Sequence, residues 1–289
     1  MEAGDGAMPP CASGLCGSPR ALVLTGYGIN CDWETSRALE LAGAEVDRVH
    51  INQLIMGQEI GEPARLDDYQ ILVVDGGFSW ADDHGAGVIL ATRLLYNIGQ
   101  DILAFIEAGK LIIGICNGFQ ALVNLGLLPG FDGDYRARQV AIVGNDCGNF
   151  RDSWVHLRVV SDSPCVFTRG QESLELPIRH GEGKFYAGEP IIQRLVEDNQ
   201  VVLRYADAQG RPAAGRFPEN PNGSLEDIAG ICDPTGRVFG LMPHPEAFNH
   251  WTNHPDWTRR KEYYRRRRKP YPEEGGGIQI FRNAVAYFR

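Results

Sequence analysis

The sequence predicts an α/β protein with a mostly parallel central sheet flanked by helices and extended by mixed or antiparallel strands. Through residues 21–126, short apolar runs that end near glycine alternate with segments of helical pattern. Such alternation is typical of a parallel sheet. Beyond residue 130 the strand candidates alternate apolar and polar residues more clearly, which favours half-exposed antiparallel strands. Neither an internal repeat nor a linker divides residues 20–250, so we expect one domain over 20–289.

The elements of the parallel half follow from local signals. Glycines at positions 43 and 109 are natural helix stops, and Asp32 is a candidate N-cap for the first helix. The run "YQILVVDGGFSW" is apolar throughout its strand-like part, as expected of a strand buried on both faces. The expected strands are 21–26, 45–51, 69–80 and 110–115, and the expected helices are 31–44, 86–108 and 117–126.

The rest of the chain contributes the additional strands and one closing helix. The expected strands are 154–160, 200–207, 227–233 and 237–246, and the helix is 278–288. Residues 1–19 are rich in Gly, Pro and Ala, and we expect them to form a disordered tail. Cys11 and Cys16 lie in that tail without nearby histidines or further cysteines, so they do not predict a metal site.

Composition excludes several classes of protein. Hydrophobic residues make up 43% and charged residues 22%, as in soluble globular proteins, and no apolar run is long enough to suggest a membrane span. Seven scattered cysteines favour a reducing compartment, the cytoplasm, over a disulfide framework. The net charge of −9 argues against nucleic-acid binding. Residues 259–269, "RRKEYYRRRRK", oppose that trend and are interpreted as a solvated loop or a partner-facing surface, a phosphate or RNA contact, or a docking site for an acidic partner.

A cysteine stands between two glycines where the run "KLIIGI" meets the next helix. The pattern Gly114-Ile115-Cys116-Asn117-Gly118 resembles a strand–turn–helix corner that holds a nucleophile outward. The N–H groups and positive dipole end of the helix that follows favour a thiolate. The same pattern also fits a small buried core cysteine, so it predicts a nucleophile only in combination with other signals.

Two further signals fall at the ends of predicted strands, where the sites of α/β sheets lie. In "MPHPE", His244 and Glu246 are two residues apart, so a carboxylate can orient and charge the imidazole. In "DGGF", the backbone of Gly77 can present an N–H to a developing oxyanion. Each alone fits an ordinary turn. Together with Cys116 they supply a nucleophile, a base, its orienter and an oxyanion donor, which predicts acyl transfer through a thioester.

Several stretches resemble one enzyme family. "GICNGFQ" and "HPE" are similar to the nucleophile elbow and the His-x-Glu of class I (triad-type) glutamine amidotransferases. The stretches "GINCDWET", "GGFSWADDHGAG", "GLLPG", "HGEG", "NPNGSLEDIAGICD" and "FGLMPHPE" resemble the glutaminase components of phosphoribosylformylglycinamidine synthase, an enzyme of de novo purine synthesis. The resemblance covers residues 20–289 and implies a flavodoxin-like glutaminase domain.

The resemblance also implies roles for particular residues. Cys116 would attack the amide of glutamine, His244 would transfer protons and Glu246 would hold it. Backbone N–H groups of Gly77 and Asn117 would form the oxyanion hole. The substrate-binding residues implied by the same resemblance are Gln120, His180 and Glu182.

The resemblance places no metal and no cofactor on this chain. Ammonia would pass to a synthetase subunit that binds ATP and Mg²⁺ and aminates formylglycinamide ribonucleotide, with a small bridging subunit as a further partner. The chain contains no Gly-x-x-x-x-Gly-Lys-Ser/Thr pattern of its own.

Some positions depart from the family's pattern, and two other functions remain open. Ala81 stands where we expect glycine, and residues 149–159 match only loosely. Cys31 ends another strand without an evident histidine partner or helix-start corner, so we interpret it as structural. The alternative functions are a cysteine hydrolase or peptidase on a similar sheet, and a non-catalytic regulatory or nucleic-acid-binding module that acts through residues 259–269.

Overall fold

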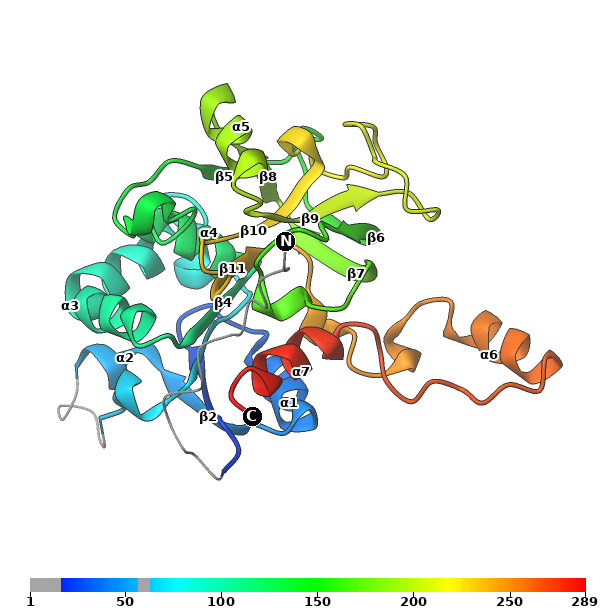
Figure 1. Ribbon diagram of the computed structural model, residues 1–289, viewed down its shortest axis with the longest axis horizontal. Helices are drawn as coiled ribbons and strands as arrows, with labels where there is room; N and C mark the ends of the chain where they lie inside the picture. The colour runs from blue at the N-terminus through cyan, green and yellow to red at the C-terminus, as the bar shows by residue number, and fades with distance from the viewer. Residues whose placement is uncertain (1–16, 57–62) are drawn as a thin grey trace, which may run out of the picture.

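A nine-stranded mixed sheet runs through the protein, with helices packed along it (Figure 1). The computed structural model describes residues 17–56 and 63–289, so the expected tail lies almost wholly outside the described residues, as do Cys11 and Cys16. The strand order is β2-β1-β3-β4-β11-β10-β9-β6-β7. The strands of the first half are β1 (Arg20–Thr25), β2 (Glu45–His50), β3 (Ile71–Val74) and β4 (Leu111–Ile115).

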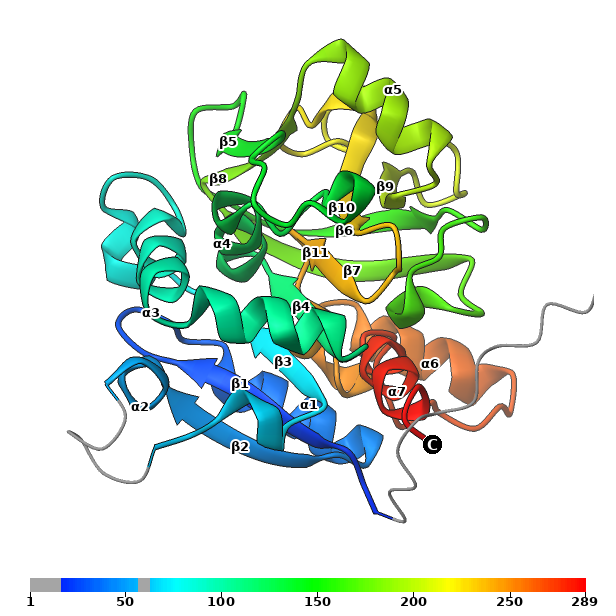
Figure 2. The same ribbon diagram turned by 60° about the vertical axis from the view of Figure 1, so that its left-hand side comes forward.

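The first half of the chain forms the predicted parallel core. Its helices are α1 (Asp32–Ala42), α2 (Ile51–Ile55), α3 (Val88–Glu107) and α4 (Asn117–Leu125). The chain steps from β1 to β2 in one direction and from β2 past β1 to β3 in the other. Because such crossovers are right-handed, α1 lies on the face opposite to α2 and α3. α1 packs against the closing helix α7 (Ile278–Ala286), while α3 packs against α4 (Figure 2).

The second half adds antiparallel and mixed strands, as predicted. Its strands are β5 (Ala141–Gly144), β6 (Arg151–Val159), β7 (Ser173–His180), β8 (Glu182–Tyr186), β9 (Val201–Ala206), β10 (Ile228–Cys232) and β11 (Val238–Leu241), and its helix α5 spans Glu189–Glu197. β11 pairs in parallel with β4 and antiparallel with β10. β11 is therefore a mixed strand, within the predicted mixed or antiparallel additions, and it joins the two halves of the sheet. This pairing sets the end of β11 beside the end of β4.

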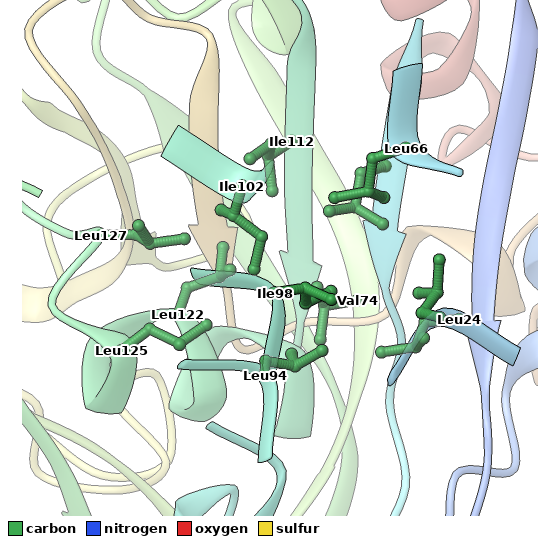
Figure 3. A pocket seen from close by; sticks show the side chains of 12 residues that line it. Leu24, Leu66, Val74, Leu94, Ile98, Ile102, Ile112, Leu122, Leu125 and Leu127 are labelled. Carbon is green, nitrogen blue, oxygen red and sulfur yellow. The ribbon is translucent and has the colours of Figure 1, made fainter. Parts of the chain in front are cut away.

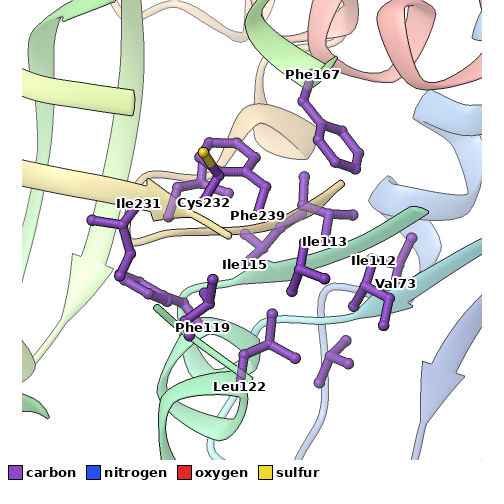
Figure 4. Close-up of a cluster of buried hydrophobic side chains, with 14 of the residues drawn as sticks. Val73, Ile112, Ile113, Ile115, Phe119, Leu122, Phe167, Ile231, Cys232 and Phe239 are labelled. Carbon is purple, nitrogen blue, oxygen red and sulfur yellow. The ribbon is translucent and has the colours of Figure 1, made fainter. Parts of the chain in front are cut away.

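Aliphatic and aromatic side chains from both halves fill the interior. Figure 4 shows side chains of β4 and β11 meeting those of α4, with Phe119, Phe239 and Ile113 among them. On the face covered by α2, α3 and α4, twelve aliphatic side chains surround a small cavity (Figure 3). Its lining is wholly apolar, and apolar cavities in proteins stay dry. We therefore read this cavity as a packing defect of the core rather than a ligand site.

The position of α3 bears on the expectation that no segment spans a membrane. Among the described residues, α3 is the one helix whose length and apolar composition would allow it to cross a membrane. The sequence nevertheless contains no uninterrupted apolar run of that length. Its apolar residues recur at helical spacing, and residues such as Leu94, Ile102 and Phe105 are buried in the core. A buried core helix passes the same test of length and composition.

The basic segment forms a helix that projects from the body of the protein (Figure 1). This helix, α6 (Trp257–Arg266), has no buried residue. The segment is therefore helical in its larger part, whereas a solvated loop was one expectation. It carries too few apolar residues to show helical periodicity, which is why the sequence pattern did not reveal the helix.

Candidate active site

Cys116 sits on a strained corner between β4 and α4. Its φ of 50° and ψ of −105° lie outside the conformations that non-glycine residues favour. Its backbone N–H donates to the Leu241 carbonyl at the end of β11, and α4 begins at the next residue. The corner expected from the Gly-x-Cys-x-Gly pattern is therefore present.

Both glycines of the pattern make room for this corner. A Cβ at Gly118 would lie 1.8 Å from the carbonyl oxygen of Val74 at the end of β3. A Cβ at Gly114 would lie 2.7 Å from the Gly118 carbonyl oxygen. Any side chain at either position would push α4 away from the sheet, so the glycines fix the height of the thiol above the strand ends.

His244 and Glu246 follow β11, and both are buried, with 2% and 1% of their surfaces exposed. Nδ1 of His244 lies 2.5 Å from Oε1 of Glu246. Burial disfavours a charged imidazole, but the carboxylate of Glu246 and the neighbouring Cys116 thiol outweigh burial and raise the pKa of His244 well above its usual value. The His-x-Glu pair thus forms as predicted, with the imidazole poised to hold a proton.

The Cys116 thiol lies beside this imidazole. Its Sγ donates a long hydrogen bond to the Arg179 carbonyl, 3.6 Å away. Nε2 of His244 is buried and has no hydrogen-bond partner among the described residues. Since Nδ1 faces Glu246, Nε2 is the ring nitrogen left to exchange a proton with the thiol.

A buried acid, Asp75, lies directly behind the pair and was missed in the sequence. It ends the apolar run of β3, and its Oδ1 accepts hydrogen bonds from Thr35 Oγ1 and from the Gly76 N–H. Burial, reinforced by the charge of Glu246, raises the pKa of Asp75 well above its usual value. The raised pKa favours the neutral carboxyl, which supports the Gly76 turn through its hydrogen bond without a second charge beside Glu246. A carboxyl group ending a buried apolar run was the signal that could have identified it.

The two predicted oxyanion donors lie on adjoining loops. Gly77 follows β3 and Asn117 opens α4, and Ser79 N donates to Oδ1 of Asn117 at 3.2 Å. Neither Gly77 N–H nor Asn117 N–H is paired among the described backbone and side-chain hydrogen bonds. At Gly77 φ is +146°, and a Cβ would meet the Gly28 carbonyl at 2.4 Å, so this close approach requires glycine.

Gln120 and Glu182 come together in one network at the start of α4. Nε2 of Gln120 donates to the Glu182 carbonyl at 2.5 Å, and its Oε1 accepts from Asn117 Nδ2 at 2.9 Å. Asn117 Nδ2 also donates to Asp82 Oδ1 at 3.1 Å, and the Glu182 carboxylate accepts from the Ala86 N–H at 3.2 Å. The network holds two carboxylates beside the nucleophile. The Gln120 side chain is used here to fix the loops, which sequence reasoning did not anticipate.

Asp82 is the functional candidate in this network that the sequence reasoning missed. Burial, together with the nearby charge of Glu182, raises the pKa of Asp82 to about 6, although the Asn117 hydrogen bond opposes the shift. Neither carboxylate forms an ion pair with an Arg, Lys or His within the described residues. The loop that carries Asp82 is strained, because Trp80, Ala81 and Asp82 all have φ between +51° and +57°. Glycine would relieve that strain at position 81, where the family's pattern led us to expect it.

His180 is buried at the end of β7 in a single tautomer. Asn145 directs its Nδ2 at the carbonyls of His180 and Asn149, so its Oδ1 must accept from His180 Nδ1 at 3.1 Å and from Gly183 N. Burial and the nearby charge of His244 lower the pKa of His180 to about 3. His180 is therefore neutral, and its Nε2 is a buried acceptor without a partner among the described residues.

The structure changes the grounds on which Cys31 was interpreted as structural, but not the conclusion that it is no second nucleophile. Cys31 is the N-cap residue of α1, one position before the predicted Asp32 cap, so it does stand at a helix start. Its Sγ lies 3.9 Å from Nδ1 of His244, so it has a histidine neighbour. A contact between positions 213 residues apart depends on the strand order and leaves no local signal. Burial raises the pKa of the Cys31 thiol to about 11, so Cys31 is not a second nucleophile.

Comparison with known proteins agrees with this geometry. Residues 18–288 match the family model of the CobB/CobQ-like glutamine amidotransferase domain. The chain is 46% identical over 271 residues to phosphoribosylformylglycinamidine synthase subunit PurQ of Methanococcus maripaludis strain S2, covering 93% of this chain and 97% of that protein. It is 44% identical over 270 residues to the Dehalococcoides mccartyi strain 195 protein of the same name, covering 93% and 98%. A chain of the solved structure of PurLQS from Thermotoga maritima shares 30% identity with a TM-score of 0.66, covering 94% of this chain and all of that one.

Proposed function

The chain belongs to the CobB/CobQ-like glutamine amidotransferase domain family and to the PurQ subunits of phosphoribosylformylglycinamidine synthase within it, and from this premise we propose which residues carry its reaction. The protein is a glutaminase, a glutamine amidotransferase of purine biosynthesis. The observation that carries the assignment of residues is the strained Cys116 corner beside the free Nε2 of His244, whose Nδ1 is held by Glu246.

Hydrolysis of glutamine follows from this arrangement. Cys116 Sγ gives its proton to Nε2 of His244 and attacks the side-chain amide carbon of glutamine. The oxyanion that develops accepts hydrogen bonds from the Gly77 and Asn117 N–H groups, each worth about 10²–10³ in rate by analogy with protease oxyanion holes. His244 then protonates the departing nitrogen, and ammonia leaves a γ-glutamyl thioester. Water activated by the same imidazole releases glutamate and restores the thiol.

Recognition of glutamine is assigned to the network around Gln120. The substrate carries an α-ammonium group, and the Asp82 and Glu182 carboxylates form a partly exposed, unpaired negative charge beside Cys116. Two like charges held together are stabilised by a cation between them. We assign the α-ammonium to this pair, with Gln120 positioning both loops. Nε2 of His180 is assigned as an acceptor for a substrate N–H, because it is neutral and unpaired.

The ammonia is consumed elsewhere in the assembly. The solved Thermotoga maritima structure is that of PurLQS, an assembly whose name joins those of PurL, PurQ and PurS. By analogy we propose that this chain works in the cytoplasm with a synthetase subunit and a small bridging subunit. The synthetase would bind ATP and Mg²⁺ and convert formylglycinamide ribonucleotide to formylglycinamidine ribonucleotide. The projecting helix α6 is our candidate contact to that partner, since exposed charge on an arm suits docking.

An electrophilic glutamine analogue tests this assignment. The analogue should label one residue per chain, Cys116, as located by mass spectrometry of peptides, and excess glutamine should protect it. The His244→Ala variant should label far more slowly. The exposed neighbour variant His84→Ala should label normally, as should the unmodified chain mixed with purified synthetase. Labelling of a different thiol, or no labelling even with the synthetase present, would contradict the assignment.

A further inference from the structure

Cys31 is a buried thiol next to the catalytic pair that the proposed reaction does not use. Its Sγ lies 3.9 Å from Nδ1 of His244, and Nδ1 lies 2.5 Å from Oε1 of Glu246. A ligand atom from each of the three side chains lies within 4.8 Å of the other two. The exposed fractions of Cys31, His244 and Glu246 are 6%, 2% and 1%, so the cluster is shielded from bulk water.

The donor set and its spacing suit zinc. Thiolate, imidazole and carboxylate are the protein ligands of Zn²⁺, and their bond lengths of about 2.0–2.3 Å place tetrahedral ligand pairs about 3.4–3.6 Å apart. The Cys31–His244 separation of 3.9 Å is already close to that spacing. The His244–Glu246 pair would have to open by about 1 Å, which a rotation of the Glu246 carboxylate can supply. Three protein ligands leave a fourth position for water.

The surroundings favour a cation at this point. The second oxygen of Glu246, Oε2, is buried without a hydrogen-bond partner among the described residues. A groove whose lining includes Trp33, Glu34, Glu273 and Glu274 also has Glu246 in its wall. The groove therefore gives a cation an acidic path from solvent to the cluster. Arg37 and Arg179 also line it and weaken that potential in part.

We propose that Cys31, Nδ1 of His244 and Glu246 form an inhibitory zinc site that switches the glutaminase off. On binding, the Cys31 thiol releases its proton to solvent, and the Nδ1 proton of His244 is replaced by the metal and moves to Nε2. A protonated Nε2 cannot take the proton of Cys116, so thioester formation stops. Removal of the metal by a chelator restores the Nδ1–H tautomer and the activity. The inhibitory effect rests on the proposed function, whereas metal binding does not.

Co²⁺ serves as the binding probe, because a thiolate ligand gives Co²⁺ a charge-transfer absorption that oxygen and nitrogen ligands do not. The probe is titrated into the full-length protein and into the variants Cys31→Ser, Cys116→Ser and Cys147→Ser. Cys147 is a partly exposed thiol, far in sequence from His244 and Glu246, and serves as the matched control. Absorption common to all four proteins reports other thiols and is subtracted. Thermal unfolding of each variant confirms that it is folded.

We expect the specific absorption in the unmodified protein and in the Cys116 and Cys147 variants, and its loss in Cys31→Ser. Isothermal calorimetry with Zn²⁺ should show the same pattern, with affinity at least about 100-fold weaker in Cys31→Ser. Zn²⁺ should inhibit glutamine hydrolysis by the unmodified protein, reversibly with a chelator, and inhibit Cys31→Ser far less. Specific absorption that survives in Cys31→Ser, disappears in Cys116→Ser, or is absent from the unmodified protein overturns the site. Binding without inhibition overturns the switch, and lack of glutaminase activity in metal-free protein counts against the proposed function instead.

Discussion

Nδ1 of His244 lies 2.5 Å from Oε1 of Glu246, and both side chains are buried beneath the Cys116 corner. A buried charge pair is costly to break, because removing one partner leaves the other unpaired in a medium that solvates it poorly. The carboxylate therefore does two jobs: it fixes the imidazole so that Nε2 faces the thiol, and it keeps the imidazolium stable once the proton arrives.

Replacing Glu246 by Gln should lower kcat for glutamine hydrolysis at least tenfold and move its alkaline limit to lower pH. Burial lowers the pKa of His244, and the Glu246 charge is the largest of the influences that raise it, so the neutral amide should lower this pKa. The imidazolium then loses its proton at lower pH. A pH profile of kcat measures both effects, with Glu274→Gln in the neighbouring groove as control. An unchanged alkaline limit would show that Glu246 does not charge the imidazole.

Replacing Asp82 by Asn should raise the KM for glutamine about 10–100-fold, because a charge-assisted hydrogen bond of about 1.5–3 kcal/mol is lost. In the unmodified protein, KM should rise as pH falls below about 6, where Asp82 takes up a proton. The variant should lack that rise. Asp83→Asn changes an exposed neighbouring carboxylate and should leave KM unaltered. An unchanged KM for glutamine in Asp82→Asn would show that this residue does not bind the substrate.

The same Asp82 substitution should stabilise the fold at neutral pH. Because the folded-state pKa of about 6 exceeds the usual 3.8, the folded protein binds the proton more tightly than the unfolded chain. That stabilisation is complete below about pH 4 and is lost as pH rises through 6. Asparagine carries no charge and so avoids this loss. We expect the free energy of unfolding of Asp82→Asn at pH 7 to exceed that of the unmodified protein by about 1 kcal/mol, after allowance for solvent screening. Urea unfolding at pH 4 and 7 measures it, and a variant less stable at pH 7 than the unmodified protein contradicts the prediction.

Replacing Gly118 by Ala should disable the nucleophile corner. The added Cβ would sit 1.8 Å from the Val74 carbonyl oxygen, so α4 must shift and carry Cys116 and the Asn117 N–H with it. A displacement of about 1 Å at a reacting centre can cost about 10² in rate. The expected loss in kcat/KM is therefore about 100-fold, together with a lower melting temperature. Gly144→Ala, where a Cβ meets nothing within 4 Å, is the matched control. Full activity in Gly118→Ala would contradict the close packing described here.

Reversing the charges of Arg267 and Arg268 to Glu should weaken binding to the synthetase subunit roughly tenfold, with a larger effect at low salt. Neither residue forms an ion pair within the described chain, although Arg267 stacks on Tyr263. The matched control neutralises Arg265 and Arg266 to Gln, because Glu262 already pairs with both. Affinity measured by titration at two salt concentrations decides the matter. Equal affinity for the unmodified chain and the reversed variant would remove α6 from the interface.

The sequence revealed the parts of the site that local patterns encode. The corner at Cys116 depends on glycines two positions to either side, and the His244–Glu246 pair depends on a spacing of two residues. The parallel core was visible because its strands are uninterrupted apolar runs between helices of clear periodicity. Residues whose surroundings are set by their own neighbours in the chain could therefore be assigned before the structure was known.

Residues that act across the fold could not be found in this way. Cys31 meets His244 only because β1 and β11 lie on either side of β3 and β4 in one sheet. Asp82 has a raised pKa because the fold buries it and because Glu182 of β8 lies nearby. The parallel pairing of β11 with β4 likewise depends on which edge strand of the first-half sheet is available to pair with β11. Each case is a choice of partner among distant segments, and local composition does not specify it.

The proposed function requires Cys116 to supply ammonia from glutamine to a synthetase partner. Reconstitution of the complex with purified synthetase, ATP, Mg²⁺ and formylglycinamide ribonucleotide tests this requirement, by comparing the unmodified chain with Cys116→Ala. Formylglycinamidine ribonucleotide is measured once with glutamine and once with an ammonium salt as the nitrogen source. We expect Cys116→Ala to abolish glutamine-dependent synthesis and to leave ammonium-dependent synthesis intact. Retention of glutamine-dependent synthesis by the variant, or loss of both activities, would contradict the proposed function.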